Sequence, residues 1–500
     1  MDAPHIVALP AVVETNAAGR GGVLVVLSDL HIGGDPGQED FFCHTELIAL
    51  LDDLDHESES EPEPVTILIN GDFFEFLQVS VPPGGNRARA VVEHPDHAAL
   101  FARLRAWNAR PGHRTVYTVG NHDSEAAWNA AIGAYLIAQG IVHDVALGYE
   151  HCFTSDDGEL TVYAEHGNEE DSQNAIVDYG HPLIAPVGTH VVTQLVNRIE
   201  PLGRFAGPDD ATTLSDIDNI YPLEMVAWWL FSNYFYRQAR RFGRYVLAPA
   251  IVIIFALRFL NNAIIRLSQG RLPEFSVGRI GQVFGFLLLD VVVVLGLVLL
   301  MLRHDFTRWR RRTGLHEPLQ IVTEGQEHYR ASCRAFLAGE RQPMHRHVAQ
   351  RSPGAGTVDV FIYGHNHFAE LEEYVAGERR TAFVNTGTWM RKIVRLPTCL
   401  KLPPVFIPEY QLTYAVLRMT PAGLAISLNE RVKPLPYRLG WAERIATFRK
   451  RPPLPPAALA GQEVTLASVT LSVPVDAPIA RSPVYAHTHA DEKTRRAVAT

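Results

Sequence analysis

The sequence predicts a layered α/β domain. Five short apolar runs bounded by turn residues have the composition of buried strands, because runs that are apolar on both faces suit interior sheet positions. The runs cover residues 23–31, 65–72, 114–123, 160–168 and 358–367. Stretches with helical spacing of apolar residues, 44–54 and 97–109, separate the first three runs. Alternation of strands and helices is typical of α/β layers.

The later part of the chain supplies strands that we expect to complete a second sheet. Residues 381–390 are followed by two strand candidates, 410–419 and 423–432, with a turn of Thr420, Pro421 and Ala422 between them. From about Lys433 the chain is rich in proline and alanine, a composition that fills a core poorly. We therefore expect residues 433–500 to form a tail or a loosely attached arm.

Length and composition limit the class of protein. A chain of 500 residues predicts two to four structural units. Its formal net charge of −10 argues against a nucleic-acid partner, which needs a basic surface. The four cysteines lack C-x-x-C spacing, which suits a reducing compartment. The first 22 residues have neither a basic start nor a continuous apolar core, so we expect no secretory signal there.

Each of the five apolar runs ends in histidine, aspartate or asparagine. In layered α/β folds, ligand sites collect beyond the carboxyl ends of the strands. Carboxylates and imidazoles together suit a two-metal site for phosphoryl transfer, provided that one ligand can bridge the ions. A single such strand end could equally be a helix cap, so the argument depends on the whole set. The set is Asp29, His31, Asp72, Asn121, His122, His166, His365 and His367.

These residues resemble the motifs of the calcineurin-like metallophosphoesterases, whose pattern is D-x-H, G-D, G-N-H-[DE], a lone histidine and G-H-x-H. All five blocks occur in this order between Asp29 and His367, and the similar chain is roughly 23–170 plus 358–432. The resemblance implies a two-sheet α-β-β-α sandwich. It also implies a hydrolase of phosphate ester bonds with two divalent metal ions, manganese or iron, with zinc also open.

The resemblance assigns a role to each matching residue. His122 is expected to protonate the leaving oxygen, with Asp123 orienting it. Attack on phosphorus is expected from a hydroxide that bridges the metals, with no covalent enzyme intermediate. The expected ligands are Asp29, His31 and His367 for one metal, Asn121, His166 and His365 for the other, and Asp72 for both.

Within this family, the segment GDFFEF at 71–76 is most similar to the G-D-x-F-E block of UDP-2,3-diacylglucosamine pyrophosphatases, which cleave a lipid-linked diphosphate. The chain departs from that group at His122, where those enzymes carry arginine, so the lipid substrate stays open. The protein Ser/Thr phosphatases are disfavoured, because they carry Asp-Arg-Gly where this chain has Phe74, Glu75 and Phe76. Glu75 could be a supporting carboxylate or a metal ligand.

A long insertion separates His166 from His365. It contains two apolar segments, 245–265 and 283–302, each with one charge and each about as long as a bilayer-spanning helix. Two buried core helices are the alternative. The preceding segment, 221–244, joins aromatic residues to four arginines, which suits either a helix at the lipid–water boundary or a core helix.

Charges in and around the two segments predict their arrangement. Arginines outnumber acidic residues before Tyr245 and after Leu302, which places these flanks and the catalytic domain in the cytoplasm by the positive-inside rule. Arg258 and Asp290 each lie eight residues from the connection, so both sit about 12 Å from it at 1.5 Å per residue. We predict that they form an ion pair, or share a polar contact with Asn261 or Asn262.

Three functions remain open from the sequence. The first is a multi-pass cell-membrane phosphoesterase acting on a phosphate ester or diphosphate, which could be lipid-linked. The second is a membrane-tethered nucleotide or cyclic-nucleotide phosphodiesterase, and the third is a catalytically silent membrane scaffold. The predicted units are an N-terminal segment (1–22), a first phosphoesterase part (23–170), a helical cap (171–244), the membrane hairpin (245–312), a second phosphoesterase part (313–432) and the tail (433–500).

Overall fold

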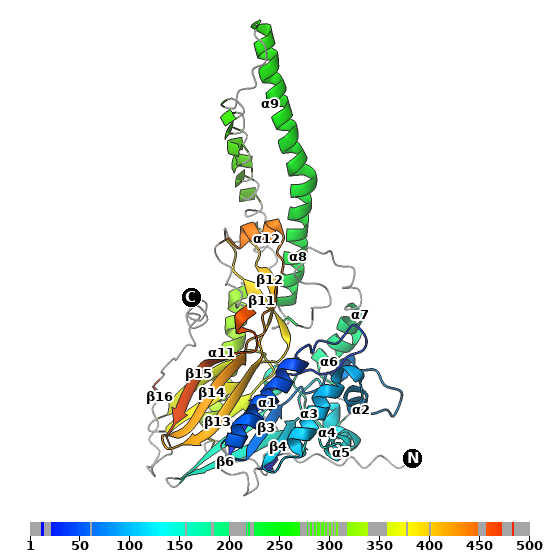
Figure 1. The fold of residues 1–500 in the computed structure, drawn as a ribbon, viewed down its shortest axis with the longest axis vertical. Helices are drawn as coiled ribbons and strands as arrows, with labels where there is room; N and C mark the ends of the chain where they lie inside the picture. Colours follow the sequence, from blue (N-terminus) through cyan, green and yellow to red (C-terminus); the bar gives the residue numbers. More distant parts are fainter. Residues whose placement is uncertain are drawn as a thin grey trace.

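Two seven-stranded sheets form the centre of the protein in a computed structural model (Figure 1). The structure describes residues 12–14, 22–60, 63–155, 158–181, 185–199, 217, 219–220, 225–270, 318–338, 358–376, 379–399, 402–448, 457–472 and 483–484, together with short runs of one to three residues between 278 and 308.

The first sheet combines a parallel half with an antiparallel half. The strands β2 to β5 pair in parallel, as the strand–helix alternation predicts, and β13 joins β2 in the antiparallel direction. In sheet order the strands are β15 (Glu463–Leu471), β14 (Gly423–Arg431), β13 (Thr413–Thr420), β2 (Val23–Leu27), β3 (Val65–Asn70), β4 (His113–Thr118) and β5 (Asp144–Ala146).

The second sheet brings together strands from before and after the insertion. Its central strands β7 and β8 pair in parallel although nearly 200 residues separate them, with Val162 opposite Val360. In sheet order the strands are β1 (Val12–Glu14), β6 (Gly148–Ser155), β7 (Gly158–Glu165), β8 (Val360–Tyr363), β10 (Arg379–Asn385), β9 (Glu370–Ala376) and β16 (Pro483–Val484).

Three hydrophobic cores hold four layers together. Leu24 and Leu68 of the first sheet pack against residues of the second sheet such as Phe153 and Ile362. The outer face of the second sheet is covered by α11 (Pro318–Leu337) through residues such as Phe336. Helices cover the outer face of the first sheet: α1 (His44–Ser60), α2 (Arg87–Val92), α3 (Ala98–Asn108), α4 (Glu125–Trp128) and α5 (Ala130–Ala138). The α-β-β-α order of layers agrees with the prediction.

The five predicted strands all form, but each is shorter than its apolar run. β2 ends at Leu27, β3 at Asn70 and β8 at Tyr363, whereas the runs were expected to continue into the polar residues that follow. The chain leaves the sheet before these residues, so the polar side chains lie on loops at the sheet edge. Short 3₁₀ turns occur at Phe76–Gln78, Pro95–His97, Asn168–Glu170 and Ala457–Leu459.

The insertion contains one helix that extends far from the sheets (Figure 1). The helices α8 (Met225–Phe242) and α9 (Ala248–Ser268) join through a π-helical turn, Gly243–Leu247, into one helix of 44 residues. Among the described residues, this helix alone is long and apolar enough to cross a membrane, with a mean hydropathy of 1.9 over a window in which no residue is buried. Of the second predicted segment, 283–302, the structure describes 12 of 20 residues in short stretches; these are helical, and Phe286, Leu288 and Val292 among them are exposed. Before α8, the chain forms α6 (Val187–Val191), a π-helical turn (Val192–Val196) and α7 (Asn197–Ile199).

The first part of this helix is a core helix. Trp228, Trp229 and Tyr236 of α8 are buried in the clusters that α8 forms with β11 (Arg391–Leu396) and β12 (Val405–Tyr410). Their aromatic rings therefore do not lie at a lipid–water boundary. Of the two interpretations of 221–244, the core helix fits the buried face of α8, whereas Tyr234 on the same helix is 63% exposed.

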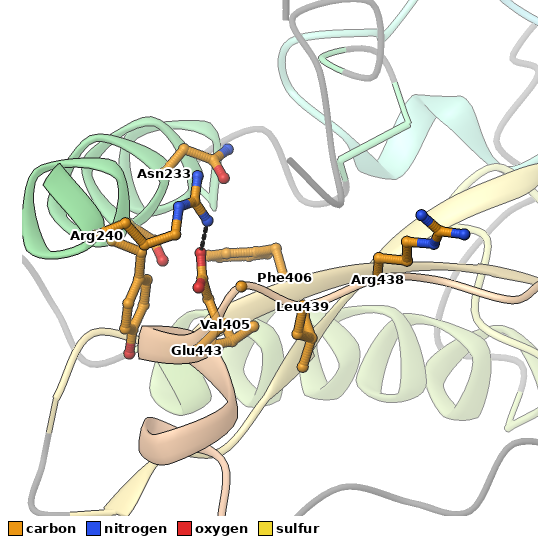
Figure 2. A pocket seen from close by; sticks show the side chains of 10 residues that line it. Asn233, Arg240, Val405, Phe406, Arg438, Leu439 and Glu443 are labelled. Carbon is orange, nitrogen blue, oxygen red and sulfur yellow. Dashed lines mark hydrogen bonds and ion pairs between the residues drawn. The ribbon is translucent and has the colours of Figure 1, made fainter. Parts of the chain in front are cut away.

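Side chains of α8 bond to two other segments of the domain. Figure 2 shows Arg240 of α8 facing Glu443 of α12 (Trp441–Ala446), with which it forms an ion pair. The hydroxyl of Tyr236 donates to the carbonyl oxygen of Pro403 at 2.6 Å, and Ser232 donates to that of Pro404. These contacts fix the direction in which α9 leaves the domain.

The expectation of a loose tail after Lys433 is wrong for much of that segment. β15 pairs with β14 along its whole length and buries Leu471 in the core between the sheets. Leu439, Ala442 and Ala446 in and before α12 are buried against β11 and β12. Proline-rich composition lowered the expected burial, but short apolar stretches between the prolines suffice for a strand and a helix turn.

Candidate metal centre

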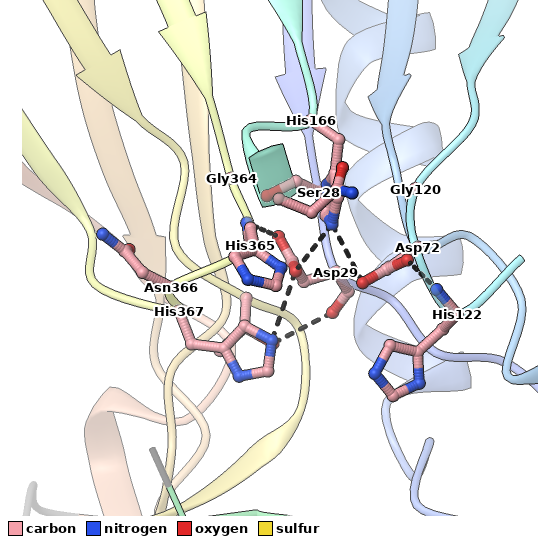
Figure 3. Close-up of polar contacts among 12 residues, drawn as sticks. Ser28, Asp29, Asp72, Gly120, His122, His166, Gly364, His365, Asn366 and His367 are labelled. Carbon is pink, nitrogen blue, oxygen red and sulfur yellow. Dashed lines mark hydrogen bonds and ion pairs between the residues drawn. The ribbon is translucent and has the colours of Figure 1, made fainter. Parts of the chain in front are cut away.

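The predicted site residues meet at one edge of the two sheets (Figure 3). Asp29 and His31 follow β2, Asp72 follows β3, and His122 follows β4. From the second sheet, His166 follows β7, while His365 and His367 follow β8. The carboxyl ends of parallel strands lie at the same edge, so packing the two sheets face to face brings both sets together.

Two groups of side chains could each hold a metal ion. The first consists of Asp29, His31 and His367, and the second of Asp72, His166 and His365. Within each group, one ligand atom from every residue lies within 4.8 Å of the others. These groups coincide with the two ligand sets expected from the sequence, apart from Asn121.

Asp72 reaches both groups. Its Oδ2 lies 2.9 Å from Nε2 of His166 in the second group and 3.7 Å from Nε2 of His31 in the first. The other carboxylate oxygen, Oδ1, accepts the backbone N–H of His122 at 2.8 Å, which fixes the carboxylate plane. This position is the one that a bridging ligand requires.

Two buried polar atoms that make no hydrogen bond show whether the site is suited to cations. Nε2 of His31 and Oδ1 of Asn121 are both buried and make no hydrogen bond. An unpaired buried polar atom costs free energy, so it needs a partner of another kind. Divalent transition metals bind imidazole nitrogens, amide oxygens and carboxylates. The nitrogen of His31 and the oxygen of Asn121 lie beside two buried carboxylates, so all three kinds of ligand are present. The residues present therefore fit a pair of metal ions.

Each histidine of the second group, and His31 of the first, has its other ring nitrogen held by a neighbouring acceptor. Nδ1 of His31 donates to Oε2 of Glu75 at 2.9 Å, and Nε2 of His365 lies 3.3 Å from Oδ2 of Asp171. Nδ1 of His166 donates to the backbone oxygen of Asn70 at 3.1 Å. Such contacts fix the tautomer and direction of metal-binding histidines.

The backbone of the candidate ligands is strained. Among the described residues, five residues other than glycine have a positive φ, and all five belong to the two groups: Asp29 (53°), His31 (48°), Asp72 (48°), His365 (65°) and His367 (57°). Non-glycine residues in this conformation are uncommon and costly, and they cluster at functional sites. The strain is explained if these side chains must point into one small volume.

Two motif glycines allow the ligands to approach the backbone. A Cβ atom at Gly120 would lie 2.2 Å from Oδ1 of Asp72. A Cβ atom at Gly364 would lie 2.6 Å from Oδ2 of Asp29. Any larger residue would push a carboxylate out of the site, which explains why the motifs need glycine before the asparagine and histidine.

The comparison with known families agrees with this geometry. The family model described as calcineurin-like phosphoesterase matches residues 22–200. The chain carries a calcineurin-like phosphoesterase domain. Such a domain indicates a metal-dependent phosphoester hydrolase. No curated protein matches the chain.

The phosphoesterase site needs residues beyond the matched range. His365 and His367 lie outside residues 22–200, yet each completes one of the two groups. The pairing of β7 with β8 brings them there. The insertion therefore interrupts the phosphoesterase site in sequence without separating it in space.

Glu75 contacts the expected acid of the phosphoesterase site. Its Oε2, which accepts the proton of His31, also accepts from Nδ1 of His122 at 2.6 Å. The side chain of Glu75 is 7% exposed, whereas that of His122 is 21% exposed. A third possible metal-holding group consists of His31, Glu75 and His122. Because both histidines turn their Nδ1 to one oxygen, we assign Glu75 as their shared acceptor.

The expected partner of His122 was Asp123, and this expectation needs correction. Asp123 accepts the backbone N–H groups of Gly120 at 2.7 Å, Phe73 at 2.7 Å and Phe74 at 3.2 Å. It thus ties the loop after β4 to the loop after β3. The carboxylate that contacts the His122 ring is that of Glu75.

The carboxylates raise the pKa values of two histidines at the site, whereas burial lowers the pKa of a third, His367. Burial alone would lower the pKa of His166, but the charges of Asp72 and Asp29 outweigh it and raise the pKa to about 10. Burial is likewise outweighed at His122, where Glu75 and Asp72 raise the pKa to about 9. A site that draws protons this strongly onto imidazoles is one that attracts cations.

Two supporting carboxylates were missed or left open by the sequence. Asp171 was not singled out, although it lies five residues after His166 and accepts from His365. Burial raises its pKa, but the hydrogen bond with His365 and the charge of that ring lower it to about 2. Neither Asp171 nor the double contact of Glu75 follows from motif spacing, because both depend on how loops fold over the strand ends.

Proposed function

We propose that the chain is a membrane-anchored phosphoesterase that hydrolyses a phosphate ester or a diphosphate with two divalent cations. The ligands would be the two groups described above, with Asn121 added to the second group and Asp72 contacting both cations. When bound, manganese or iron ions would supply the positive charge that activates water and neutralises phosphoryl oxygens. The proposal depends mainly on one observation: the domain that contains the two candidate metal-binding groups also carries a long, exposed, apolar helix.

His122 is the proposed proton donor to the leaving oxygen. Its Nδ1 proton is held by Glu75, so Nε2 is the atom that can face a substrate. Burial lowers the pKa of His122, but the charges of Glu75 and Asp72 outweigh it and raise this pKa in the metal-free protein. The proton would move from Nε2 to the leaving oxygen as the bond to phosphorus breaks.

The proposed anchor is a hairpin of residues 245–265 and 283–302. The apolar side chains of α9 are exposed, among them Val252, Leu257 and Leu260, which is unfavourable in water over so large a surface. The ion pair of Arg258 with Asp290 joins the two segments. Exposed apolar helices with an internally paired charge suit a lipid environment.

The proposed orientation places the catalytic domain in the cytoplasm. It is supported by the arginines that flank the two segments on the domain side, outnumbering those in the connection. Labelling of cysteines introduced at Glu274 and Thr357 in intact cells tests the orientation: only the cysteine at 274 should label from outside. Labelling of the cysteine at 357 alone would mean that the orientation is the opposite of the proposed one.

Two substrate classes remain candidates for the same chemistry. A lipid-linked phosphate or diphosphate is the first, because the anchor keeps the enzyme at a membrane. A nucleotide or cyclic nucleotide is the second, and one observation favours it. From Met225 to Tyr245 the helix rises about 30 Å at 1.5 Å per residue, so the site stands well away from the start of the apolar segment.

A silent scaffold is disfavoured by the site itself. None of the seven expected ligands is lost, and five of them are held in strained conformations. Strain of this kind persists where a function requires it.

The direct experiment is to assay the purified full chain with Mn²⁺ against lipid diphosphates and nucleotides side by side. Turnover of either class supports the proposal, and the preferred class decides between the two candidates. Absence of turnover of both, with bound metal and a folded protein, would refute the enzyme proposal.

A further inference from the structure

The helix α12 and the turn after it direct their large apolar side chains outward. Trp441, Ile445 and Phe448 recur at helical spacing and are 43%, 43% and 60% exposed. On the other side of the helix, the small residues Ala442 and Ala446 are buried. A helix on the surface of a domain in water normally buries its large apolar residues and exposes polar ones. We call Trp441, Ile445 and Phe448 the α12 face; its pattern suits apolar surroundings outside the domain.

The α12 face lies level with the start of the exposed apolar helix. Figure 1 shows α12 at the end of the domain from which α9 leaves. The indole of Trp441 packs on the backbone of Gly243, where a Cβ atom would collide with the ring. Gly243 comes less than one helical turn before Tyr245, at which the apolar segment begins. The ion pair of Arg240 with Glu443 holds the two helices in this arrangement.

Exposed arginines and an aromatic ring occur at the same level. Arg241 and Arg244 of the long helix are exposed, and the guanidinium of Arg244 lies 5.6 Å from the centre of the Tyr245 ring. Tyr245 is itself 68% exposed. On α12, Arg444 is exposed next to Ile445. Aromatic rings beside basic side chains are typical of the lipid–water boundary, where the basic groups contact the phosphates of anionic lipids.

We propose that the α12 face is a second membrane contact, which lies in the headgroup layer of an anionic bilayer while α9 enters the bilayer beside it. This contact rests on the proposed function, since without the membrane anchor no bilayer lies next to the face. A single helix would leave the domain free to tilt about the anchor. With two contacts, the catalytic domain keeps one height and one orientation above the bilayer.

The lipid exposure of three positions in the full chain tests this contact. Ile445→Cys probes the α12 face, Leu257→Cys probes the anchor helix α9, and Ile137→Cys is the matched control. Ile137 is also an exposed isoleucine on a short helix, 47% exposed, but its helix α5 lies at the opposite end of the domain from α12 (Figure 1). Each variant also carries Cys152→Ser and Cys399→Ser, because the other two native cysteines are buried.

Each introduced cysteine is labelled with the fluorophore nitrobenzoxadiazole, and the chain is placed in phosphatidylcholine–phosphatidylglycerol vesicles that contain spin-labelled lipids. We expect the labels at 445 and 257 to lose at least about half of their fluorescence, and the label at 137 to lose almost none. In phosphatidylcholine alone the loss at 445 should become smaller, because the arginines then lack anionic lipids, whereas the loss at 257 should not change.

The outcomes separate this contact from the anchor. Quenching at 257 but not at 445 would overturn the second contact and leave the anchor intact, and equal quenching at 445 and 137 would overturn it as well. If neither 257 nor 445 is quenched, the membrane anchor of the proposed function fails instead. A label at 445 that is shielded from iodide but not quenched by lipid would mean that another protein surface, such as a second copy of the chain, covers the α12 face, and the lipid contact would be refuted.

Discussion

The guanidinium of Arg258 lies 2.5 Å from a carboxylate oxygen of Asp290. The two residues belong to different apolar segments, and the sequence predicted the pair from their equal distance to the connection. Their side chains are 44% and 38% exposed, so the pair lies on the surface of the segments rather than in a core. If the two segments form the proposed membrane hairpin, each charge compensates the other at a depth where either one alone would oppose insertion.

A charge swap tests what this pair does. Asp290→Arg alone should impair membrane insertion, because an unpaired charge at such depth costs about 2.5–3.5 kcal/mol on insertion scales. The double variant Arg258→Asp with Asp290→Arg should restore it. Carbonate extraction of membranes measures the inserted fraction. A double variant no better than the worse single one would mean that the contact does not support insertion.

His122→Ala tests the proposed acid. Both metal ions should stay bound, because His122 belongs to neither ligand group that contains Asp72 or Asp29. Turnover of substrates with poor leaving groups should fall by roughly 10²–10⁴, whereas p-nitrophenol, a good leaving group, needs less protonation and should lose less. Equal losses for good and poor leaving groups would rule out proton donation by His122.

Glu75→Gln tests the shared acceptor. The amide keeps the shape but removes the charge that holds both His31 and His122. Loss of a carboxylate behind a metal-binding histidine typically costs about 10–100-fold in metal affinity or activity. The alkaline limit of the pH–rate profile should also move to lower pH, since Glu75 raises the pKa of His122. Glu443→Gln, which alters a buried ion pair far from the site, is the control and should change neither quantity.

The metal-free protein should lose stability as pH rises above neutrality. The folded-state pKa is raised to about 10 at His166 and to about 9 at His122, against about 6.5 in an unfolded chain. Groups with raised folded pKa values stabilise the folded state below about pH 6.5, and this contribution disappears as pH rises toward 9–10.

Thermal melts of chelator-treated protein from pH 6 to 10 check this expectation. His166→Gln should flatten the dependence, because the group with the larger shift is then absent. Metal-saturated protein should show a weaker dependence, since bound cations take the place of protons on the imidazoles. Equal slopes with and without metal would contradict the cation-attracting role of the carboxylates.

The residues of the two candidate metal-binding groups could be located from the sequence because they follow strand ends, whereas their assignment as ligands is what the family resemblance implies and stays a prediction. A buried strand is visible as an apolar run, and the motifs after Leu27, Asn70 and Tyr363 stand at fixed offsets from it. The layered fold follows from the same runs. Contacts that join two loops, such as Glu75 with His122 or His365 with Asp171, depend on tertiary packing and have no periodic signal.

Burial of isolated elements was harder to predict. The aromatic residues of α8 suit a lipid boundary and a core equally, and only their packing against β11 and β12 decides. β15 lies within a segment whose prolines suggested a tail, yet its pairing with β14 provides the burial that composition did not indicate. In both cases the element is buried because it packs against strands that are distant from it in the sequence.

Metal content of wild-type protein and of Asp72→Asn tests the central claim most directly. Asp72 lies between the two ligand groups, 2.9 Å from His166 and 3.7 Å from His31, so removing its charge should weaken both ions. Elemental analysis of the purified wild-type chain should find about two divalent ions per chain, the number a two-metal phosphoesterase holds. The variant should hold fewer and lack phosphoesterase turnover. An Asp72→Asn protein that keeps two ions and normal turnover would contradict the account.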